Sequence, residues 1–582
     1  MWPRLGKGGT GLTTGPMTTE PMTTGPGARP GSDPERTADA AALDALLRCW
    51  VRENALAVPA EGPLVWELPL VGVRLVADLV RRSEAGFHRF ANARIEGGAP
   101  LTATAVAALL ATQAAGEEAS PGNVVDLVGR VADSQARVAE HLRCRAAEPE
   151  DPAGTTPFLA AEQALVLGHP LHPTPKSRTG LGGADAAEFS PELRGSFALH
   201  WFAADPSVVS SDGAAVKRLA EFAPELPDGQ VPVPAHPWQA REVRARPEIR
   251  RMLDEGLLRD LGAAGEPWFP TASLRTVYRP DAAVMLKFSL GLPITNSRRE
   301  NLHKELRRGV EIDRLLRAGV EAELAAAHPG FGIVRDPAWL AVGGEDGANG
   351  LELVVRDNPF GPDDRVACVA GLVAERPDVG RAQLTALVED LVARTGRSAA
   401  DVAHEWCGRY FDAVIAPVLW LYREFGLGLE AHQQNTVVVL DEQGWPVGGW
   451  YRDNQGYYLS ESRVAELERF LPEIGIAGQN RVPDEVIDER LGYYIGLNNL
   501  VGLVGAFGNL GLAAERGLLD LLRQRLRGYA DLPLAATLAE QPVVRCKANL
   551  LTRVGGMDEL VGPLETQSVY RDVPNPLVGG QS

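Results

Sequence analysis

The densest group of polar side chains in this sequence is the segment GHPLHPTPKSRTG, residues 168–180. Three prolines within six residues prevent a regular helix, so we expect a stiff, extended loop. The loop carries His169, His172, Lys176 and Arg178, and no carboxylate adjoins them in the sequence. This cation-only set favours contact with a polyanion over metal binding, because two histidines on a proline-rich loop do not converge as they do on a helix. The alternative is a surface loop whose charges face water.

A second cationic group lies on the segment LRTVYRPDAAVMLKFSL, which predicts a β-hairpin with its turn at Arg-Pro-Asp. Ser273, Arg275 and Thr276 belong to the first strand, and Lys287 on the second strand should lie opposite Arg275. A lysine within an apolar strand needs a partner for its charge, either a buried carboxylate or a bound phosphate. Two facing cations repel each other unless an anion lies between them, which favours the phosphate.

The stretch ITNSRREN, residues 294–301, is predicted to end a strand and to open a helix. Backbone N–H groups at such a helix start, together with Arg299, can hold a carboxylate. We expect at least one of the two arginines in this stretch to be a solvated helix residue.

A second predicted hairpin consists of TVVVL and PVGGWYR on either side of a DEQG turn. His432, Gln434 and Asn435 precede its first strand, and closing the turn brings Asp453 back beside them. One amide oxygen and one carboxylate at this end suit Mg²⁺, which keeps several waters and bridges phosphates. Ordinary capping of hairpin ends by Asn and Asp is the alternative. The meeting of four polar residue types at one end argues against it.

The elements that must position these groups form four predicted units. Residues 1–38 contain 22 Gly, Pro or Thr and predict a disordered tail. Residues 39–150 predict a helical domain, because LDALLRCWVREN, VRLVADLVRRS and VVDLVGRVADSQARVAEHLRCR repeat apolar residues at helical spacing. Residues 151–300 are of mixed α/β texture, and residues 301–582 are rich in helices, interrupted by the second hairpin.

Composition limits the class of protein. With 582 residues, 45% of them hydrophobic and 23% charged, the chain can form a large globular protein of three or four units. Its net charge of −18 repels nucleic acids and anionic membranes, so we expect neither as a partner, although a local basic pocket remains compatible with it. Five scattered cysteines without a CxxC pair, and the lack of a signal-peptide core or a spanning apolar run, predict a cytoplasmic protein.

Two cationic groups and one metal-binding hairpin together indicate an enzyme that binds Mg·ATP. The sequence has no GxxxxGK[ST] phosphate loop, so a different scaffold must hold the nucleotide. Two reactions then compete: phosphoryl transfer on a kinase-like scaffold, and nucleotidyl transfer that activates a carboxylate.

The segments GHPLHPTPKSRTG, SLRTV, KFSLGLPITNSRR, EAHQQN and YRDNQG have the order and spacing of one family. Beyond its tail, the chain closely resembles the IucA/IucC-like, NRPS-independent siderophore synthetases. The resemblance implies an α+β, cupped-hand architecture with a helical thumb, mixed α/β fingers and a helix-rich palm that carries the hairpin of the metal and ATP site. It also implies adenylation of citrate, a citrate derivative or a related polycarboxylic acid, then condensation with an amine or alcohol to give an amide or ester. Homodimers are common among such enzymes.

The resemblance also assigns roles to individual positions. The residues that match the ATP-phosphate grip are Ser273, Arg275, Thr276 and Lys287. Those that match the nucleotide-side loop are His169, His172, Lys176 and Arg178, with a looser match at Arg356. The acid-binding positions are Thr295, Arg299, His432 and Gln434, and the Mg²⁺ ligands are Asn435 and Asp453. The catalytic charge neutralisation is expected from Lys287, Arg275, Arg299 and His432.

Two other classes remain as alternatives. A kinase-like phosphotransferase would need an aspartate base a few residues before Asn435, and the sequence HQQN has none there. A siderophore-binding or ferric-reductase-like protein is suggested by the family's C-terminal region, which has been likened to iron reductases. No cysteine cluster is present to hold an iron–sulfur centre. The sequence identifies neither the acid, nor its acceptor, nor the base for the condensation.

Overall fold

The computed structural model describes residues 33–116, 120–294, 297–344, 348–453, 455–557 and 568–579. Most of the predicted tail therefore lies outside the described residues. Its predicted end at Ala38 is wrong, because α1 already begins at Pro34. The Asp33 side chain caps this helix by accepting a hydrogen bond from the N–H of Glu35, and proline is favoured in the first turn, where its missing N–H costs nothing.

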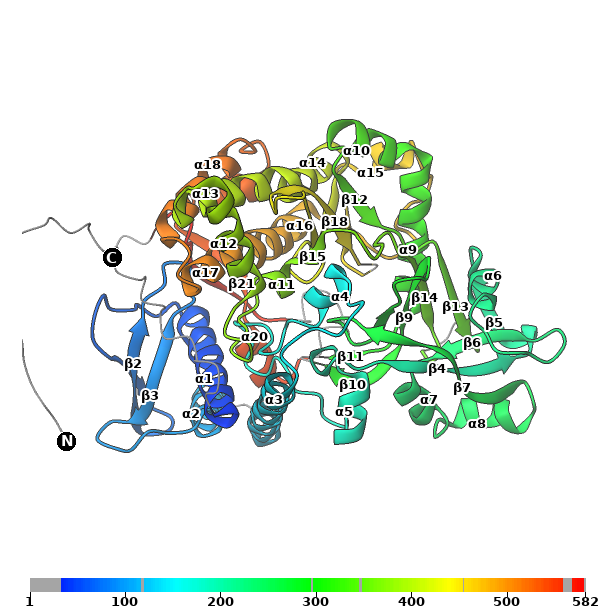
Figure 1. Ribbon diagram of the computed structural model, residues 1–582, viewed down its shortest axis with the longest axis horizontal. Coiled ribbons are helices and arrows are strands. Elements are labelled where there is room, and N and C mark those ends of the chain that lie inside the picture. Colours follow the sequence, from blue (N-terminus) through cyan, green and yellow to red (C-terminus); the bar gives the residue numbers. More distant parts are fainter. Residues whose placement is uncertain are drawn as a thin grey trace, which may run out of the picture.

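The N-terminal unit, blue at the left of Figure 1, combines three helices with a small antiparallel sheet. The helices are α1 (Pro34–Glu53), α2 (Ala103–Ala115) and α3 (Pro121–Ala147), and the strands are β1 (Leu64–Leu68), β2 (Val73–Arg81) and β3 (Arg89–Ile95). Two of the three predicted helical segments, in α1 and α3, are confirmed.

The third predicted helix of this unit, VRLVADLVRRS, is wrong: it forms strand β2. Gly72 adopts a positive φ of 74° in a tight turn that pairs Leu68 with Val73. This turn folds β2 back onto β1, and valines fit the pleated surface that results. A short apolar run satisfies helical spacing as well, so periodicity alone could not separate the two.

An eight-stranded sheet, green at the right of Figure 1, has the order β5-β13-β14-β9-β8-β7-β4-β6. Its strands are β4 (Phe197–Ala204), β5 (Val209–Asp212), β6 (Val231–Ala235), β7 (Leu258–Pro270), β8 (Thr276–Tyr278), β9 (Val284–Phe288), β13 (Ala338–Val342) and β14 (Leu353–Asp357). The first predicted hairpin is confirmed as β8–β9, but its predicted register is wrong by one residue, because Lys287 lies opposite Thr276 and not Arg275. Ser273 and Arg275 precede the first strand, which begins only at Thr276. The sheet takes β13 and β14 from beyond residue 300, where a domain boundary stays a prediction.

Short helices pack around this sheet. They are α4 (Pro157–Glu162), α5 (Gly183–Phe189), α6 (Ala215–Ala220), α7 (Pro237–Val243) and α8 (Pro247–Asp254). The stretch ITNSRREN, expected to open a helix, instead contributes β11 (Ser297–Arg299), which pairs with β10 (Leu290–Ile294). Helix α9 begins only at His303. Arg298 and Arg299 therefore lie on a strand, so the prediction of a helical position is wrong. The prediction that at least one of them is solvated is confirmed, because Arg298 is exposed.

The C-terminal part surrounds a four-stranded sheet of order β12-β18-β17-β15 with helices. These strands are β12 (Phe331–Val334), β15 (Val366–Cys368), β17 (Thr436–Leu440) and β18 (Pro446–Arg452). The second predicted hairpin is confirmed as β17–β18, with Thr436 opposite Tyr451. The surrounding helices are α9 (His303–Leu315), α10 (Glu321–Ala327), α11 (Val369–Leu372), α12 (Gln383–Thr395), α13 (Ala399–Tyr410), α14 (Ala416–Phe425), α15 (Val464–Glu468), α16 (Asp484–Leu491), α17 (Gly502–Asn509), α18 (Glu515–Arg527), α19 (Pro533–Glu540) and α20 (Asn549–Val554).

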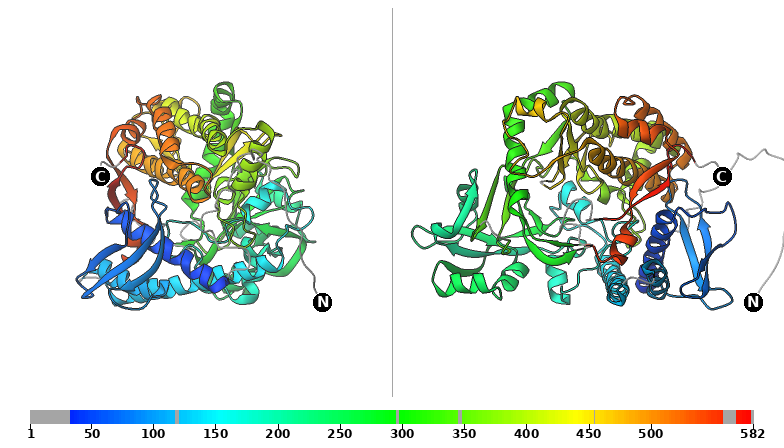
Figure 2. Two further views of the ribbon diagram at one scale, coloured as in Figure 1. Left: turned by 60° about the vertical axis from the view of Figure 1, so that its left-hand side comes forward. Right: turned by 180° about the vertical axis from the view of Figure 1, so that it is seen from behind.

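Two small sheets complete the C-terminal part, β16 (Leu427–Leu429)-β19 (Tyr457–Ser460)-β20 (Arg481–Val482) and β21 (Val543–Lys547)-β22 (Tyr570–Pro574). A π-helical stretch, Gly492–Val501, joins α16 to α17, and such stretches often mark functional sites. Separate apolar cores fill the three parts of the molecule, which Figure 2 shows from two further sides. Among the described helices, none has the length and apolar character needed to cross a bilayer.

Candidate active site

A cavity of about 630 Å³ lies where the three parts of the molecule meet. This volume is within the usual range for small-molecule sites. Thirteen Lys or Arg and five Asp or Glu line it, a surplus of eight positive charges in a chain whose net charge is −18. The structure therefore contains a strongly basic pocket of the kind that an acidic protein needs in order to attract polyanions.

Nearly all residues proposed from the sequence line this one cavity. They come from the loop 168–180, the hairpin β8–β9, strands β11 and β14, and the ends of β17 and β18. The residues found there are His169, His172, Lys176, Arg178, Ser273, Arg275, Thr276, Lys287, Arg299, Arg356, His432, Gln434, Asn435 and Asp453. The remaining candidate, Thr295, lies outside the described residues.

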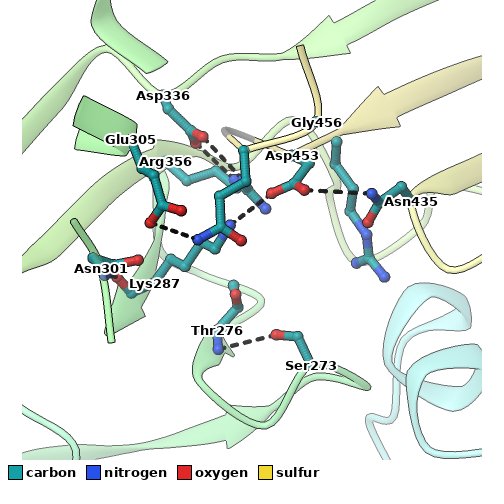
Figure 3. Close-up of polar contacts among 12 residues, drawn as sticks. Ser273, Thr276, Lys287, Asn301, Glu305, Asp336, Arg356, Asn435, Asp453 and Gly456 are labelled. Atoms are coloured by element: carbon teal, nitrogen blue, oxygen red, sulfur yellow. Dashed lines mark hydrogen bonds and ion pairs between the residues drawn. The ribbon is translucent and has the colours of Figure 1, made fainter. Parts of the chain in front are cut away.

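Lys287 on β9 has a buried carboxylate beside it, which was one of the two alternatives for its charge. Its Nζ lies 2.6 Å from Oδ1 of Asp453, just after β18 (Figure 3). Burial lowers the pKa of the Lys287 ammonium to about 8, with Asp453 opposing and Arg275 adding to the shift. Burial raises the pKa of the Asp453 carboxyl, but Lys287 and Arg356 outweigh it and hold that pKa well below its usual value. The pair is therefore ionised at neutral pH.

Arg275, at the entry to β8, has its guanidinium fixed by three acceptors. Nη1 donates to the carbonyl of Arg299 at 2.9 Å and to Oδ1 of Asn301 at 2.8 Å, and Nη2 donates to Oε1 of Gln455 at 2.8 Å. Burial and the nearby Arg299 lower the pKa of Arg275 to about 10. The sequence did not identify Asn301 or Gln455 as site residues, although Asn301 lies in the stretch ITNSRREN and Gln455 in YRDNQG.

The turn before β8 is conformationally strained. Leu274 has φ of +63°, in the left-handed region that large side chains rarely adopt. The turn is held by hydrogen bonds from the N–H of Leu274 to the carbonyl of Thr271 at 2.8 Å and from the N–H of Thr276 to Oγ of Ser273 at 3.2 Å. Such strain persists only where the surroundings impose it, and it is common at ligand-binding sites.

Asn435 and Asp453 meet at the open end of the second hairpin, as expected. Nδ2 of Asn435 donates to Oδ2 of Asp453 at 3.5 Å (Figure 3). Within the described residues, no three His, Cys, Asp or Glu side chains gather into a metal-binding group. One carboxylate and one amide still fit Mg²⁺, because this ion completes its shell with waters and the phosphates of a nucleotide.

The predicted cationic loop is neither water-facing nor free of carboxylates. Lys176 and Arg178 are both buried and share one partner, Glu192, which is itself buried. Nη2 of Arg178 lies 2.6 Å from Oε1 of Glu192, and Lys176 forms an ion pair with the same oxygen. No carboxylate adjoins the loop in the sequence, but the fold brings Glu192 into contact with it. A direct contact of these cations with nucleotide stays a prediction.

Each histidine of the loop accepts a backbone hydrogen bond at its Nδ1, His169 from Leu171 at 3.0 Å and His172 from Thr174 at 3.1 Å. Nε2 of His169 lies 2.9 Å from the amide nitrogen of Asn498 on the π-helical stretch. Burial lowers the pKa of His169 to about 3, with His172 adding to the shift. His169 therefore offers a neutral ring to a ligand.

Replacing Glu192 with glutamine should destabilise the fold, because it leaves Lys176 and Arg178 buried without a carboxylate. We expect a loss of about 3 kcal/mol in the free energy of unfolding, measured by urea denaturation. The two cations outweigh burial and hold the pKa of Glu192 well below its usual value, so this stabilisation is present above the unfolded carboxyl pKa and is lost as pH falls. Glu188→Gln, at an exposed position of α5, serves as the control; equal effects would contradict the structural role.

His432 also lines the cavity, together with Gln434, Arg490 and Lys547. Burial lowers the pKa of His432 to about 4, with Asp453 opposing the shift. Its imidazole is therefore neutral at pH 7 and can act only through hydrogen bonds, whereas positive charge is carried by Arg299, Arg490 and Lys547, which also line the cavity. The last two lie far along the chain from the recognised motifs, and no local signal identified them.

Arg356 on β14 also lines the cavity but is paired with Asp336. Its Nε and Nη2 lie 2.7 and 2.9 Å from the two carboxylate oxygens (Figure 3). Burial lowers the pKa of the Arg356 guanidinium, but Asp336 outweighs it and raises that pKa above its usual value. Arg356 thus adds its charge to the wall behind Asp453.

Two family models match the chain. The IucA / IucC family model matches residues 157–374, and the model described as a ferric iron reductase FhuF-like transporter matches residues 404–562. The first covers the cationic loop and the hairpin β8–β9, and the second covers the hairpin β17–β18.

Curated relatives match over most of the chain. The rhizobactin siderophore biosynthesis protein RhbC of Rhizobium meliloti (strain 1021) is 37% identical over 92% of this chain and 97% of its own length. The spermidine-citrate ligase of Bacillus anthracis is 36% identical over 78% of this chain and 79% of its own length.

Solved structures agree with these matches. The ATP-bound aerobactin synthetase IucA from a hypervirulent Klebsiella pneumoniae superposes with a TM-score of 0.82 at 28% identity, covering 92% of this chain and 99% of that one. The predicted mixed α and β, multi-domain architecture is thereby confirmed.

Proposed function

Since this chain belongs to the IucA/IucC family, we propose that it is an ATP-dependent siderophore synthetase that adenylates one carboxylate of citrate, or of a related polycarboxylic acid. The activated acyl group then passes to an amine or alcohol, giving an amide or ester. The observation that carries the proposal is the cavity itself, in which buried cations from separate hairpins converge beside Asp453 and Asn435.

The reaction requires two anions to meet. In the proposed assignment, Arg275 and Lys287, with Ser273 and Thr276, hold the phosphates of ATP, while Arg299, His432 and Gln434 hold the acid. Neutralising both charges in a buried site lets a carboxylate oxygen attack the α-phosphorus in line, and pyrophosphate leaves. His432 donates or accepts a hydrogen bond as a neutral ring, so Arg299 supplies the charge at the acid.

Asn435 and Asp453 would hold Mg²⁺ between the phosphates and the hairpin β17–β18. The ion, when bound, supplies further neutralisation of the phosphate oxygens. The ammonium of Lys287 lies 2.6 Å from the carboxylate of Asp453. In the proposed roles, Lys287 would bind the phosphates and Asp453 would bind the metal. The ammonium would therefore have to move away from Asp453 towards the phosphates when Mg·ATP binds. A cytoplasmic location and a homodimer belong to this proposal as well.

Two other functions receive less support. A kinase-like phosphotransferase would have to differ in reaction from relatives that match nearly the whole chain and are named as siderophore biosynthesis proteins or citrate ligases. The FhuF-like match covers residues 404–562 alone, and this segment provides only one wall of the cavity.

The products formed from ATP test the proposal. Protein incubated with Mg·ATP, citrate and hydroxylamine is expected to give AMP, pyrophosphate and a citryl hydroxamate, detected by chromatography and mass spectrometry. Omitting citrate should abolish AMP formation. Release of ADP with a phosphorylated product would contradict the proposal, whereas AMP formation with another polycarboxylic acid would retain the mechanism and change the substrate.

A further inference from the structure

A buried ion pair that no step above uses lies behind the cavity. Glu162, the last residue of α4, is fully buried, and its Oε1 lies 2.7 Å from Nη2 of Arg452, whose side chain is 7% exposed. Arg452 ends β18 and directly precedes Asp453. Because each charge is removed from water, each depends on the other for compensation.

Arg452 fixes the end of the second hairpin. Its Nε and Nη2 donate to the carbonyl oxygen of Gln434 at 3.2 and 2.9 Å, and its backbone N–H donates to the carbonyl of Asn435 at 2.9 Å. The guanidinium also lies over the ring of Phe158 in α4, 5.6 Å from its centre. Arg452 thus holds Gln434, a proposed acid-binding residue, through its side chain, and Asn435, a proposed metal ligand, through its backbone.

Glu162 fixes the strained turn before β8. Its second oxygen, Oε2, accepts a hydrogen bond from the N–H of Ala272 at 2.8 Å. Ala272 lies within the turn in which Leu274 has its positive φ, and this turn delivers Ser273 and Arg275 to the cavity. A strained conformation has to be imposed by its neighbours, and Glu162 is such a neighbour.

The two hairpins belong to different sheets, so no ladder of hydrogen bonds sets the distance between them. Lys287–Asp453 and Arg275–Gln455 also cross the gap, but Lys287, Asp453 and Arg275 are expected to engage the substrates. The hydrogen bonds that join Glu162 to Ala272 and Arg452 to Gln434 involve backbone groups, and neither Glu162 nor Arg452 is assigned to a substrate.

We propose that Glu162 and Arg452 are positioning residues that set the distance between the phosphate-binding turn and the acid- and metal-binding end of β17–β18. The inference rests on the proposed adenylation. In-line attack requires the reacting atoms about 3–3.5 Å apart, and a displacement of about 1 Å can lower the rate about 100-fold. In the proposed assignment, ATP without Mg²⁺ is held by the hairpin β8–β9 and its turn, so its binding does not depend on the position of β17–β18.

The expected signature is a loss of turnover without a loss of binding. Glu162→Gln keeps the volume and an acceptor for Ala272 but removes the charge, and it should lower kcat for citrate-dependent AMP formation about 100-fold. The dissociation constant for ATP in the absence of Mg²⁺, measured by calorimetry, should change less than about 3-fold. Arg452→Lys retains a charge for Glu162 but lacks the fork that also reaches Gln434. Arg452→Lys should be more stable than Arg452→Met, but its kcat should fall about as much as that of Glu162→Gln.

Asp378→Asn provides a matched control. Asp378 pairs with Arg376, the two side chains are 0% and 6% exposed, and neither lines the cavity. This variant should lower the melting temperature while kcat stays within about 3-fold of the unmodified protein. Turnover within 3-fold in Glu162→Gln or Arg452→Lys, or losses that merely follow melting temperature as in Asp378→Asn, would overturn the inference. If the unmodified protein forms no AMP from any polycarboxylic acid, the proposed function fails, and this inference with it.

Discussion

Replacing Lys287 with methionine is expected to lower citrate-dependent AMP formation about 1,000-fold. The ammonium is the one cation on the hairpin β8–β9 that faces Asp453 directly, at 2.6 Å. In the proposed mechanism it carries positive charge to the phosphates in a site from which water is largely removed. Removing one such donor from a preorganised site typically lowers kcat by 100- to 1,000-fold. Steady-state rates of AMP release measure the effect.

A loss of folding must be separated from a loss of chemistry in this variant. Lys287→Met removes the ion pair between Lys287 and the largely buried Asp453, which should destabilise the protein by about 3 kcal/mol. The double variant Lys287→Met/Asp453→Asn removes both charges and should recover most of that stability without recovering activity. Lys217→Met, at an exposed position of α6, is the control. Activity restored together with stability would show that Lys287 is only structural.

Asp453→Asn is expected to lower the apparent affinity for Mg²⁺ at least about 100-fold, and turnover at saturating metal about 1,000-fold. Asp453 is the one charged oxygen donor at the end of β17–β18 that lies beside an amide ligand, Asn435. Without its charge, the metal and Lys287 both lose their counter-ion in the cavity. Titration with Mn²⁺ followed by electron paramagnetic resonance, in the presence of ATP, measures the metal affinity.

The control for this metal site is Asp363→Asn, which changes an exposed carboxylate after β14 and should leave the titration unchanged. Asn435→Ala should weaken metal binding less than Asp453→Asn does, because an uncharged ligand is lost. An Asp453→Asn protein that binds Mn²⁺ and responds to Mg²⁺ as the unmodified protein does would remove Asp453 from the ligand set.

The two hairpins could be predicted because their signals are local. Apolar and β-branched runs flank Arg-Pro-Asp in one and DEQG in the other, and each turn brings its two flanking strands side by side. Asn435 and Asp453 could therefore be brought together from the sequence, 18 residues apart. The error at residues 73–81 arose where a Gly72 turn, rather than periodicity, decided the structure.

The carboxylates that pair with the cations of the site could not be predicted, because these ion pairs join residues that lie far apart in the sequence. Lys287 finds Asp453 166 residues later, and Arg452 pairs with Glu162 from the far side of the cavity wall. Sequence reasoning identified the cations, since an Arg or Lys in an apolar strand is conspicuous. The carboxylates that neutralise them stand in ordinary helical or loop contexts, as Glu192 does after α5.

The surplus of positive charge around the cavity also favours one order in which the reactants bind. In the proposed reaction, the positively charged wall would draw in ATP and a polycarboxylate and repel a protonated amine, with part of its charge offset by Glu192, Asp336 and Glu162 behind it. Once ATP and the polycarboxylate are bound, their negative charges cancel most of the positive potential in the cavity, and a cation is no longer repelled from its entrance. A protonated amine acceptor would thus enter only after ATP and the acid are bound. The order of the two half-reactions would then follow from electrostatics, without a moving gate. Raising the ionic strength would blunt this ordering along with the attraction.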